Sequence, residues 1–313
     1  MAEKLATREA YGAALVELAD KYDFVVLDAD LAEATKTIKF KKACPERFFD
    51  CGIAEGNMMS VAAGIATTGK TVFASSFAMF AAGRAFEQVR NSIGYPHLNV
   101  KIGATHAGIT VGEDGATHQC NEDIALMRTI PGMTIVNPSD AIEAKAAVEA
   151  ALTTNGPFYL RFGRFAVPII NDTPDYKFEL GKGVCVADGK DVTIVATGLM
   201  VSMALEARDL LAKKKIRARV INMHTIKPID KEILAQAAAE TGAIVTAEEH
   251  NIIGGLGAAV TEAICESCPV PVIRVGMNDT YGHSGTVPAL LEAYGLTPEK
   301  IAEAAKKAIS MKK

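Results

Sequence analysis

The chain has 313 residues, of which 49% are hydrophobic and 22% are charged, and its formal net charge is −4. This length favours two globular domains over one. Lysines and acidic residues are interspersed and form no basic stripe, which argues against binding to nucleic acid. The sequence has no run of about 18 apolar residues, so we expect no transmembrane helix and no membrane association.

Residues 1–5 lack the basic-then-apolar order of a signal peptide, and a cytoplasmic location is therefore expected. The 6 cysteines are scattered, and only Cys265 and Cys268 have CxxC spacing. A structural zinc ion needs four ligands, and no second pair accompanies this one. We expect reduced thiols and no metal site built from cysteine.

The first half of the chain alternates helix and strand. Tyr11, Ala14, Leu15 and Leu18 have the spacing of one helix face within residues 7–20. Asp140 followed by Glu143 indicates a capping box at the start of another helix. The other predicted helices span 55–68, 80–93 and 123–129, and the predicted strands span 24–27, 71–74, 100–103, 133–136 and 158–161.

Residues 171–186 are predicted to form a linker, because Pro, Asp, Asn and Gly accumulate around them. A second alternating unit follows, with strands predicted at 192–196, 217–221, 243–246 and 272–275 and helices near 200–213, 230–240, 255–266 and 297–309. Such alternation is typical of parallel sheets with helices on both faces. We expect two α/β domains, at residues 1–170 and 187–313, each with a mostly parallel sheet flanked by helices.

A glycine-rich loop, residues 105–119, should leave the end of a strand. It begins with Thr105-His106 and ends with Gly112-Glu113-Asp114-Gly115-Ala116-Thr117-His118-Gln119. Its glycines allow positive φ and can bring His106, Asp114 and His118 to one point. Histidines beside a carboxylate suit proton transfer on polar substrates, although a solvated turn with a helix-capping Asp would show the same pattern.

Glu55 should open a helix in a segment rich in glycine and methionine that water reaches poorly. Burial would let this carboxyl group hold or donate a proton, while the helix dipole alone also favours glutamate at a helix start. Phe77 and Phe80 lie three residues apart at a strand-to-helix junction, a spacing that is typical of core pairs.

Four segments, in this order, resemble the transketolase family: residues 51–59, residues 73–80, the glycine-rich loop and residues 191–198. The resemblance covers essentially the whole chain. It implies a domain that binds the pyrimidine of thiamine diphosphate (1–170), followed by a transketolase C-terminal domain (187–313). It also implies that Glu55 hydrogen-bonds the aminopyrimidine ring, that Phe77 and Phe80 stack on or flank this ring, and that Asp30 lies beside the cofactor.

The same resemblance implies catalytic roles for Glu55, His106 and His118, and sugar-binding roles for His106, Asp114 and His118. Two arginines of the family hold the acceptor phosphate, for which a guanidinium fork has the right charge and geometry. Arg8 matches the first and Arg161 the second, and Arg164 is a rival for Arg161 because the segment Arg161-Phe162-Gly163-Arg164 aligns ambiguously.

Three further positions follow from the resemblance. Thr35 lies where the family uses a serine and is expected to join the phosphate contacts. Gly83 stands where many transketolases place a tyrosine, which leaves one side of the ring unassigned. His283 should approach the site without an assigned role.

The sequence lacks the Gly-Asp-Gly and later Asn of thiamine enzymes, which signal the site for Mg²⁺ and the diphosphate. We expect a separate N-terminal transketolase subunit to supply that site. The chain would then be the C-terminal subunit of a split transketolase, transferring a two-carbon ketol unit between sugar phosphates. In the family, the C-terminal domain is a dimer-forming module. Two copies of this chain, each with one N-terminal subunit, would form a heterotetramer.

Other assignments remain open. The beta subunit of 2-oxo acid dehydrogenases has the same two domains but usually lacks the glycine-rich loop, and deoxyxylulose phosphate synthase has a similar loop in one long chain. A catalytically silent scaffold could keep the same fold. Gly254-Gly255-Leu256-Gly257 resembles a phosphate cradle at a helix start but lacks the GxGxxG spacing of dinucleotide sites.

Overall fold

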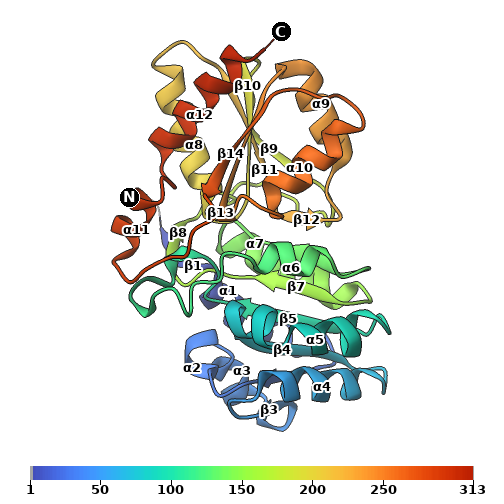
Figure 1. Ribbon diagram of the computed structural model, residues 1–313. Helices are drawn as coiled ribbons and strands as arrows, with labels where there is room; N and C mark the ends of the chain where they lie inside the picture. The colour runs from blue at the N-terminus through green and yellow to red at the C-terminus, as the bar shows by residue number, and fades with distance from the viewer. Residues whose placement is uncertain (1–2, 313) are drawn as a thin grey trace.

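Strands and helices alternate along nearly the whole computed structural model, which describes residues 3–312 (Figure 1). They form two α/β domains, one above the other in the figure, each built on a mostly parallel sheet with helices on its faces. The predicted fold class is confirmed.

The sheet of the first domain has seven strands in the order β12-β6-β7-β5-β4-β2-β3, and only β12 runs antiparallel to its neighbour. Central strands such as β2 and β5 are buried along their whole length, as expected for a sheet covered on both faces. The strands are β2 (Phe24–Asp28), β3 (Phe48–Asp50), β4 (Thr71–Phe77), β5 (Val100–Thr105), β6 (Thr134–Val136), β7 (Phe158–Arg161) and β12 (Thr225–Lys227).

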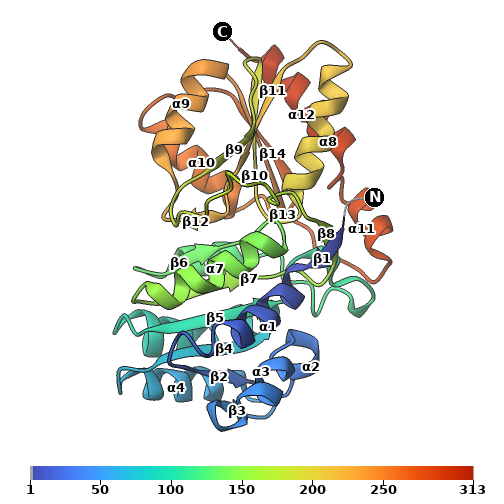
Figure 2. The same ribbon diagram turned by 180° about the vertical axis from the view of Figure 1, so that it is seen from behind.

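Helices cover both faces of this sheet. One face carries α1 (Thr7–Glu17), α2 (Ala32–Thr35), α3 (Ile38–Ala43) and α7 (Ala141–Thr153), which lie toward the viewer in Figure 2. The short helix η1 (Pro45–Arg47) follows α3. The other carries α4 (Glu55–Ala66), η2 (Met79–Arg84), α5 (Phe86–Gln88), η3 (Val89–Gly94) and α6 (Asp123–Arg128). Tyr11, Ala14 and Leu15 of α1 are fully buried, as their spacing predicts.

The sequence predicts one α-helix over residues 80–93, but the segment 79–94 contains two π-helical segments, η2 and η3, on either side of α5. Asp140 does cap α7, because its Oδ1 accepts from the backbone N–H of Glu143 at 2.9 Å. The Glu143 carboxylate turns to the backbone N–H of Ser139 instead, at 2.7 Å. Such a cap contributes about 1 kcal/mol to helix stability.

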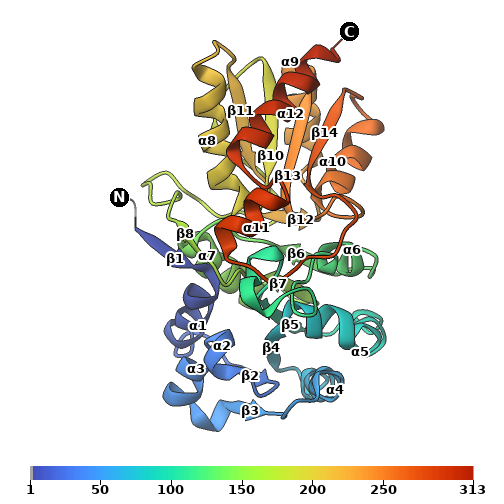
Figure 3. The same ribbon diagram turned by 60° about the vertical axis from the view of Figure 1, so that its left-hand side comes forward.

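The sheet of the second domain has five strands in the order β14-β13-β10-β11-β9, with β9 antiparallel to β11. Its strands are β9 (Val184–Ala187), β10 (Val192–Ala196), β11 (Ala218–Asn222), β13 (Ile244–Asn251) and β14 (Val272–Met277). Its helices are α8 (Met200–Ala212), α9 (Lys231–Thr241), α10 (Leu256–Cys265), α11 (Val287–Ala293) and α12 (Pro298–Ser310). Helix α11 packs against the glycine-rich loop of the first domain (Figure 3).

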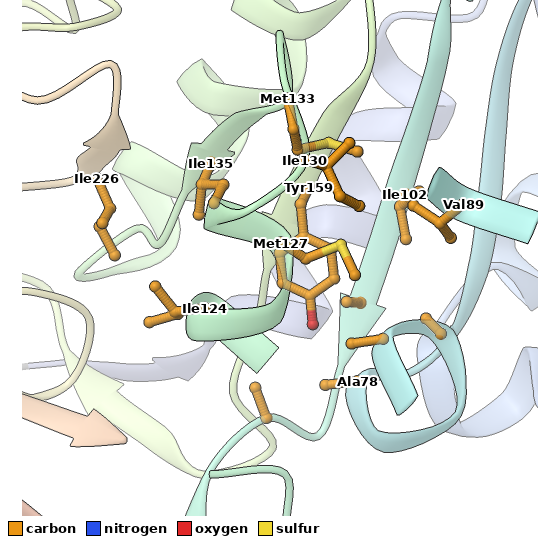
Figure 4. Close-up of a cluster of buried hydrophobic side chains, with 14 of the residues drawn as sticks. Ala78, Val89, Ile102, Ile124, Met127, Ile130, Met133, Ile135, Tyr159 and Ile226 are labelled. Atoms are coloured by element: carbon orange, nitrogen blue, oxygen red, sulfur yellow. The ribbon is translucent and has the colours of Figure 1, made fainter. Parts of the chain in front are cut away.

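One strand from the second half of the sequence joins the sheet of the first domain. Strand β12 follows β11 in the chain but joins the first sheet beside β6. Ile226 of β12 therefore lies in one core with Ile124, Met127 and Ile135 (Figure 4). The hydrophobic core thus runs without interruption from the first domain into the second.

The predicted linker is bordered by strands. Before it, β8 (Ala166–Pro168) pairs antiparallel with β1 (Lys4–Ala6) in a two-stranded ribbon. Its last residues, from Val184 on, belong to strand β9 of the second sheet. The irregular connection spans residues 169–183, so it begins and ends earlier than the predicted linker, 171–186.

None of the helices within residues 3–312 is both long and apolar enough to cross a membrane. Over the same residues, all six cysteines are free thiols; Cys265 is the last residue of α10, and Cys268 lies beyond its end.

Candidate active site

The predicted site residues converge at the carboxyl ends of the parallel strands of the first sheet, where ligands of open α/β sheets bind. Phe77 is the last residue of β4, and Thr105 is the last residue of β5 and opens the glycine-rich loop. Arg161 is the last residue of the neighbouring strand β7. Parallel pairing of β4, β5 and β7 places these three strand ends side by side.

Glu55 is the first residue of α4 and is only 1% exposed. Its Oε2 accepts a hydrogen bond from Nη1 of Arg84 at 2.8 Å. The same guanidinium lies over the ring of Phe80, 4.5 Å from its centroid. Arg84 was missed in the sequence, because only the π-helical turn of η2 brings its side chain back to Glu55.

An aromatic wall continues from Phe80. The Phe77 ring lies 5.9 Å from that of Phe80 and stacks on His106 at 3.8 Å, centroid to centroid. The ring of His118 meets the edge of Phe80 at 5.4 Å. The structure therefore brings together both phenylalanines and both histidines that the sequence singled out.

His106 is buried, and its hydrogen bonds define its protonation. Its Nε2 lies 3.1 Å from Nη1 of Arg8, and its Nδ1 lies 2.9 Å from Oγ1 of Thr105. Burial, aided by the positive charges of Arg8 and Arg164, lowers the pKa of His106 to about 3. The ring is thus a neutral imidazole at physiological pH.

Arg164, and not Arg161, faces the glycine-rich loop. Nη1 of Arg164 donates to the carbonyl oxygen of Val111 and lies 3.8 Å from Oδ2 of Asp114. Its side chain is 37% exposed, so a ligand can reach the guanidinium.

Arg161 is 3% exposed and its guanidinium is engaged inside the protein. It donates to both carboxylate oxygens of Asp123, at 2.8 and 3.2 Å, and to the backbone oxygen of Glu249 at 2.9 Å. The prediction that Arg161 binds the acceptor phosphate does not fit this arrangement, because the group is buried and its Nε and Nη2 already donate to protein oxygens. These contacts favour a structural role for Arg161.

Thr35 is also withdrawn from solvent, which does not fit a phosphate contact. Its Oγ1 donates to Oδ2 of Asp28 at 2.7 Å, and Thr37 donates to the same oxygen at 2.8 Å. Burial raises the pKa of Asp28 to about 6. Asp30 does lie at the end of β2 and is exposed, with a left-handed backbone (φ 61°).

The C-terminal domain also reaches the loop. The backbone oxygen of His283 accepts a hydrogen bond from Nε2 of Gln119 at 2.9 Å, while the imidazole of His283 turns to Tyr294. His283 therefore contacts the glycine-rich loop through its main chain.

Two family models match the chain: "Transketolase, pyrimidine binding domain" over residues 3–169, and "Transketolase, C-terminal domain" over residues 181–301. The chain belongs to the transketolase family.

Three of the proteins that this chain matches over nearly their whole length are named as a section, a subunit or a split-gene form of transketolase. A transketolase C-terminal section of Methanocaldococcus jannaschii is 50% identical over 95% of this chain and 94% of its own length. The 6-deoxy-6-sulfo-D-fructose transketolase subunit of a Clostridium species is 45% identical over 95% and 92%. A solved split gene transketolase, described as an inactive beta4 tetramer, is 54% identical, with a TM-score of 0.91 over 99% of this chain and 100% of that one.

The Gly254–Gly257 turn of this transketolase chain holds a carboxylate of its own. Glu248 accepts from the backbone N–H groups of Leu256 at 2.6 Å and Gly257 at 2.8 Å. The backbone N–H groups at the start of α10, which resembles a phosphate cradle in sequence, thus bind the carboxyl group of Glu248.

Proposed function

We propose that this chain is the C-terminal subunit of a thiamine-diphosphate-dependent transketolase that transfers a two-carbon ketol unit between ketose and aldose phosphates. The observation that carries the proposal is the position of Glu55 and its aromatic wall directly beside His106 and His118. A two-carbon transfer needs one region that holds the cofactor ring and a second region that holds a hydroxylated sugar, and the glycine-rich loop joins them.

The residues present fit the pyrimidine end of thiamine diphosphate. Glu55 offers a buried carboxylate that can hold a proton at a ring nitrogen, and Phe77 and Phe80 offer apolar ring faces. The cofactor, when bound, supplies the carbanion chemistry that lets a two-carbon unit leave a ketose. Asp30 is the remaining candidate contact at this end, since it is exposed at the end of β2.

The metal and diphosphate end of the cofactor is assigned to a partner. Within residues 3–312 there is no group of three or more His, Cys, Asp or Glu side chains that could hold a metal ion. We therefore assign Mg²⁺ and the diphosphate to a separate N-terminal subunit. The names of the relatives, a C-terminal section and a subunit, support this division. Two copies of each chain would form a heterotetramer.

The sugar would lie along the glycine-rich loop. His106 is a neutral hydrogen-bonding group beside Arg8, and Asp114 is an exposed carboxylate suited to a hydroxyl. Arg8 and Arg164 supply the positive charge for an anionic end group. The Clostridium relative is named for a sulfonated sugar, so a sulfonate is the alternative to a phosphate at this end.

Reconstitution tests the proposal. The chain, a partner carrying the Gly-Asp-Gly and Asn motif, and their mixture are assayed with thiamine diphosphate, Mg²⁺, a ketose phosphate donor and an aldose phosphate acceptor. Only the mixture should transfer the two-carbon unit. Transfer by this chain alone would refute the split subunit, and a correctly assembled but inactive mixture would point to a silent scaffold.

A further inference from the structure

The glycine-rich loop is held in place by a carboxylate from the other domain. Glu249 lies in β13 of the second domain and is 5% exposed. Its Oε1 accepts from the backbone N–H of Thr110 at 2.7 Å. Thr110 lies within the loop, between His106 and Asp114, so this hydrogen bond, like that from Gln119 to the backbone oxygen of His283, joins the second domain to the segment that bears the proposed sugar-binding side chains.

The fit between Glu249 and the loop is close. Gly108 has a φ of 79°, and a Cβ built on it would lie 2.3 Å from Cδ and Oε1 of Glu249. A side chain at position 108 would therefore collide with the carboxylate as well as strain the backbone. The observed path of the loop therefore requires glycine at position 108.

Glu249 is itself fixed from the first domain. Its backbone oxygen accepts from the guanidinium of Arg161 at 2.9 Å, and Arg161 is held in turn by Asp123. Asp123 and Arg161 are both buried, so this pair is rigid compared with an exposed ion pair. The contacts thus connect Asp123 of α6, Arg161 of β7 and Glu249 of β13 to the loop. In this chain of contacts, Arg161 supports Glu249 and does not bind phosphate.

We propose that Glu249 is a positioning residue for two-carbon transfer: it accepts the Thr110 N–H and thereby fixes the loop that carries His106, Asp114 and His118. The reaction part of this inference rests on the proposed function. The anchoring part does not, and it can be measured on the chain alone.

What Glu249 supplies is an acceptor of the right length and not a charge. Burial raises the pKa of Glu249 to about 7, against the lowering effect of Arg161, and an oxygen of either protonation state can accept the Thr110 N–H. Glu249→Gln keeps the length and an acceptor oxygen. Glu249→Met keeps the approximate size but removes the acceptor.

Glu248 offers a matched control one residue away on the same strand. It is fully buried, burial raises its pKa to about 7 as well, and its hydrogen bonds go to α10 within the second domain. Glu248→Met removes an equally buried acceptor without touching the loop. Thr110→Pro removes the same hydrogen bond from the loop side, should Glu249→Met fail to fold.

Amide hydrogen exchange on the unassembled chain is the first measurement. Glu249→Met and Thr110→Pro should raise exchange by at least about 10-fold in residues 105–119, while Glu248→Met should raise it only around α10. Glu249→Gln should protect the loop as the original residue does. Unchanged loop exchange in Glu249→Met would overturn the inference.

Two-carbon transfer by the assembled enzyme is the second measurement. Glu249→Met should lower kcat by about 10- to 100-fold, the scale of a misplacement of about 1 Å, with thiamine diphosphate affinity within about 2-fold. Glu249→Gln should recover kcat to within about 3-fold. Equal loss in Glu249→Met and Glu248→Met, or no recovery with Gln, would overturn the positioning role. An inactive original assembly with a protected loop would instead count against the proposed function alone.

Discussion

Nη1 of Arg8 donates a hydrogen bond to Nε2 of His106 across 3.1 Å. A guanidinium can only donate, so Nε2 must be the acceptor and Nδ1 must carry the proton. The Nδ1–H group donates a hydrogen bond to Oγ1 of Thr105. Arg8 is itself anchored by the backbone oxygen of Ala34 at 2.8 Å. The protein therefore fixes one tautomer of His106 in its neutral form.

His106 is expected to remain uncharged from about pH 5 to about pH 9, because its pKa is lowered to about 3, mainly by burial. As the pH falls below 6.5, His106 binds a proton in the unfolded chain but stays neutral in the folded chain. This residue therefore makes the protein less stable in acid. Imidazole NMR should show no titration of His106 in that range. Arg8→Met should move its pKa upward, and a midpoint near 6.5 in the original chain would contradict the assignment.

Glu55→Gln keeps the size of the side chain but cannot exchange a carboxyl proton. Turnover of the assembled enzyme should fall at least ~100-fold, the lower end of general acid–base contributions. Steady-state kinetics check this, with the exposed Glu299→Gln as a control that keeps full turnover. Undiminished turnover in Glu55→Gln would mean that this glutamate merely starts α4.

Arg164→Ala should raise the KM of a phosphorylated acceptor about 10- to 150-fold. The removed contact is a hydrogen bond to a charged group, worth roughly 1.5–3 kcal/mol. An acceptor without the phosphate should be nearly indifferent to the change. Equal weakening of both acceptors would show that Arg164 supports the loop through Val111 and does not bind the anion.

Arg161→Ala should act on stability. It leaves the Asp123 carboxylate buried without its partner, and breaking such a pair costs about 3–5 kcal/mol. Denaturant unfolding measures the loss, and Arg164→Ala serves as its control, since that side chain is 37% exposed. A loss below about 1 kcal/mol would disprove the structural role.

Glu248 should make the chain less stable as the pH rises. Its pKa is raised to about 7 by burial, so the folded chain holds this proton more tightly than the unfolded chain does. The stabilisation of the folded chain by this proton is complete below about pH 4.5. It decreases as the pH rises and is lost by about pH 7, which changes the free energy of unfolding by on the order of 3 kcal/mol. Unfolding curves of Glu248→Gln should decline less over this range. Parallel curves for the two proteins would rule the prediction out.

Most strands and helices could be predicted from the sequence, because buried strands and amphipathic helices show clear patterns of apolar residues. Strands β2, β4, β5 and β10 all lie where their apolar runs predict them. Strands of three residues, such as β1, β8 and β12, are too short for a period, and they form only because a distant partner pairs with them.

The site was less predictable than the fold. Two arginines three residues apart look alike in sequence, and only burial against Asp123 separates Arg161 from Arg164. Thr35 carries the expected hydroxyl, but the carboxylate of Asp28 takes it. In both cases the competing partner comes from elsewhere in the chain, where local sequence gives no sign of it.

Strand β12 has a consequence for dissecting this molecule. A fragment that stops at the linker would lose β12, and the edge of β6 would then be exposed. The backbone oxygens of Arg128 and Ile130 would also lose the Lys227 ammonium, which donates to them at 2.8 and 2.6 Å. Bare sheet edges recruit strands from other molecules. A chimera that takes its whole C-terminal half from a relative would therefore also replace β12, the outermost strand of the first domain. In such a chimera, residues 225–227 should come from the same protein as the first domain.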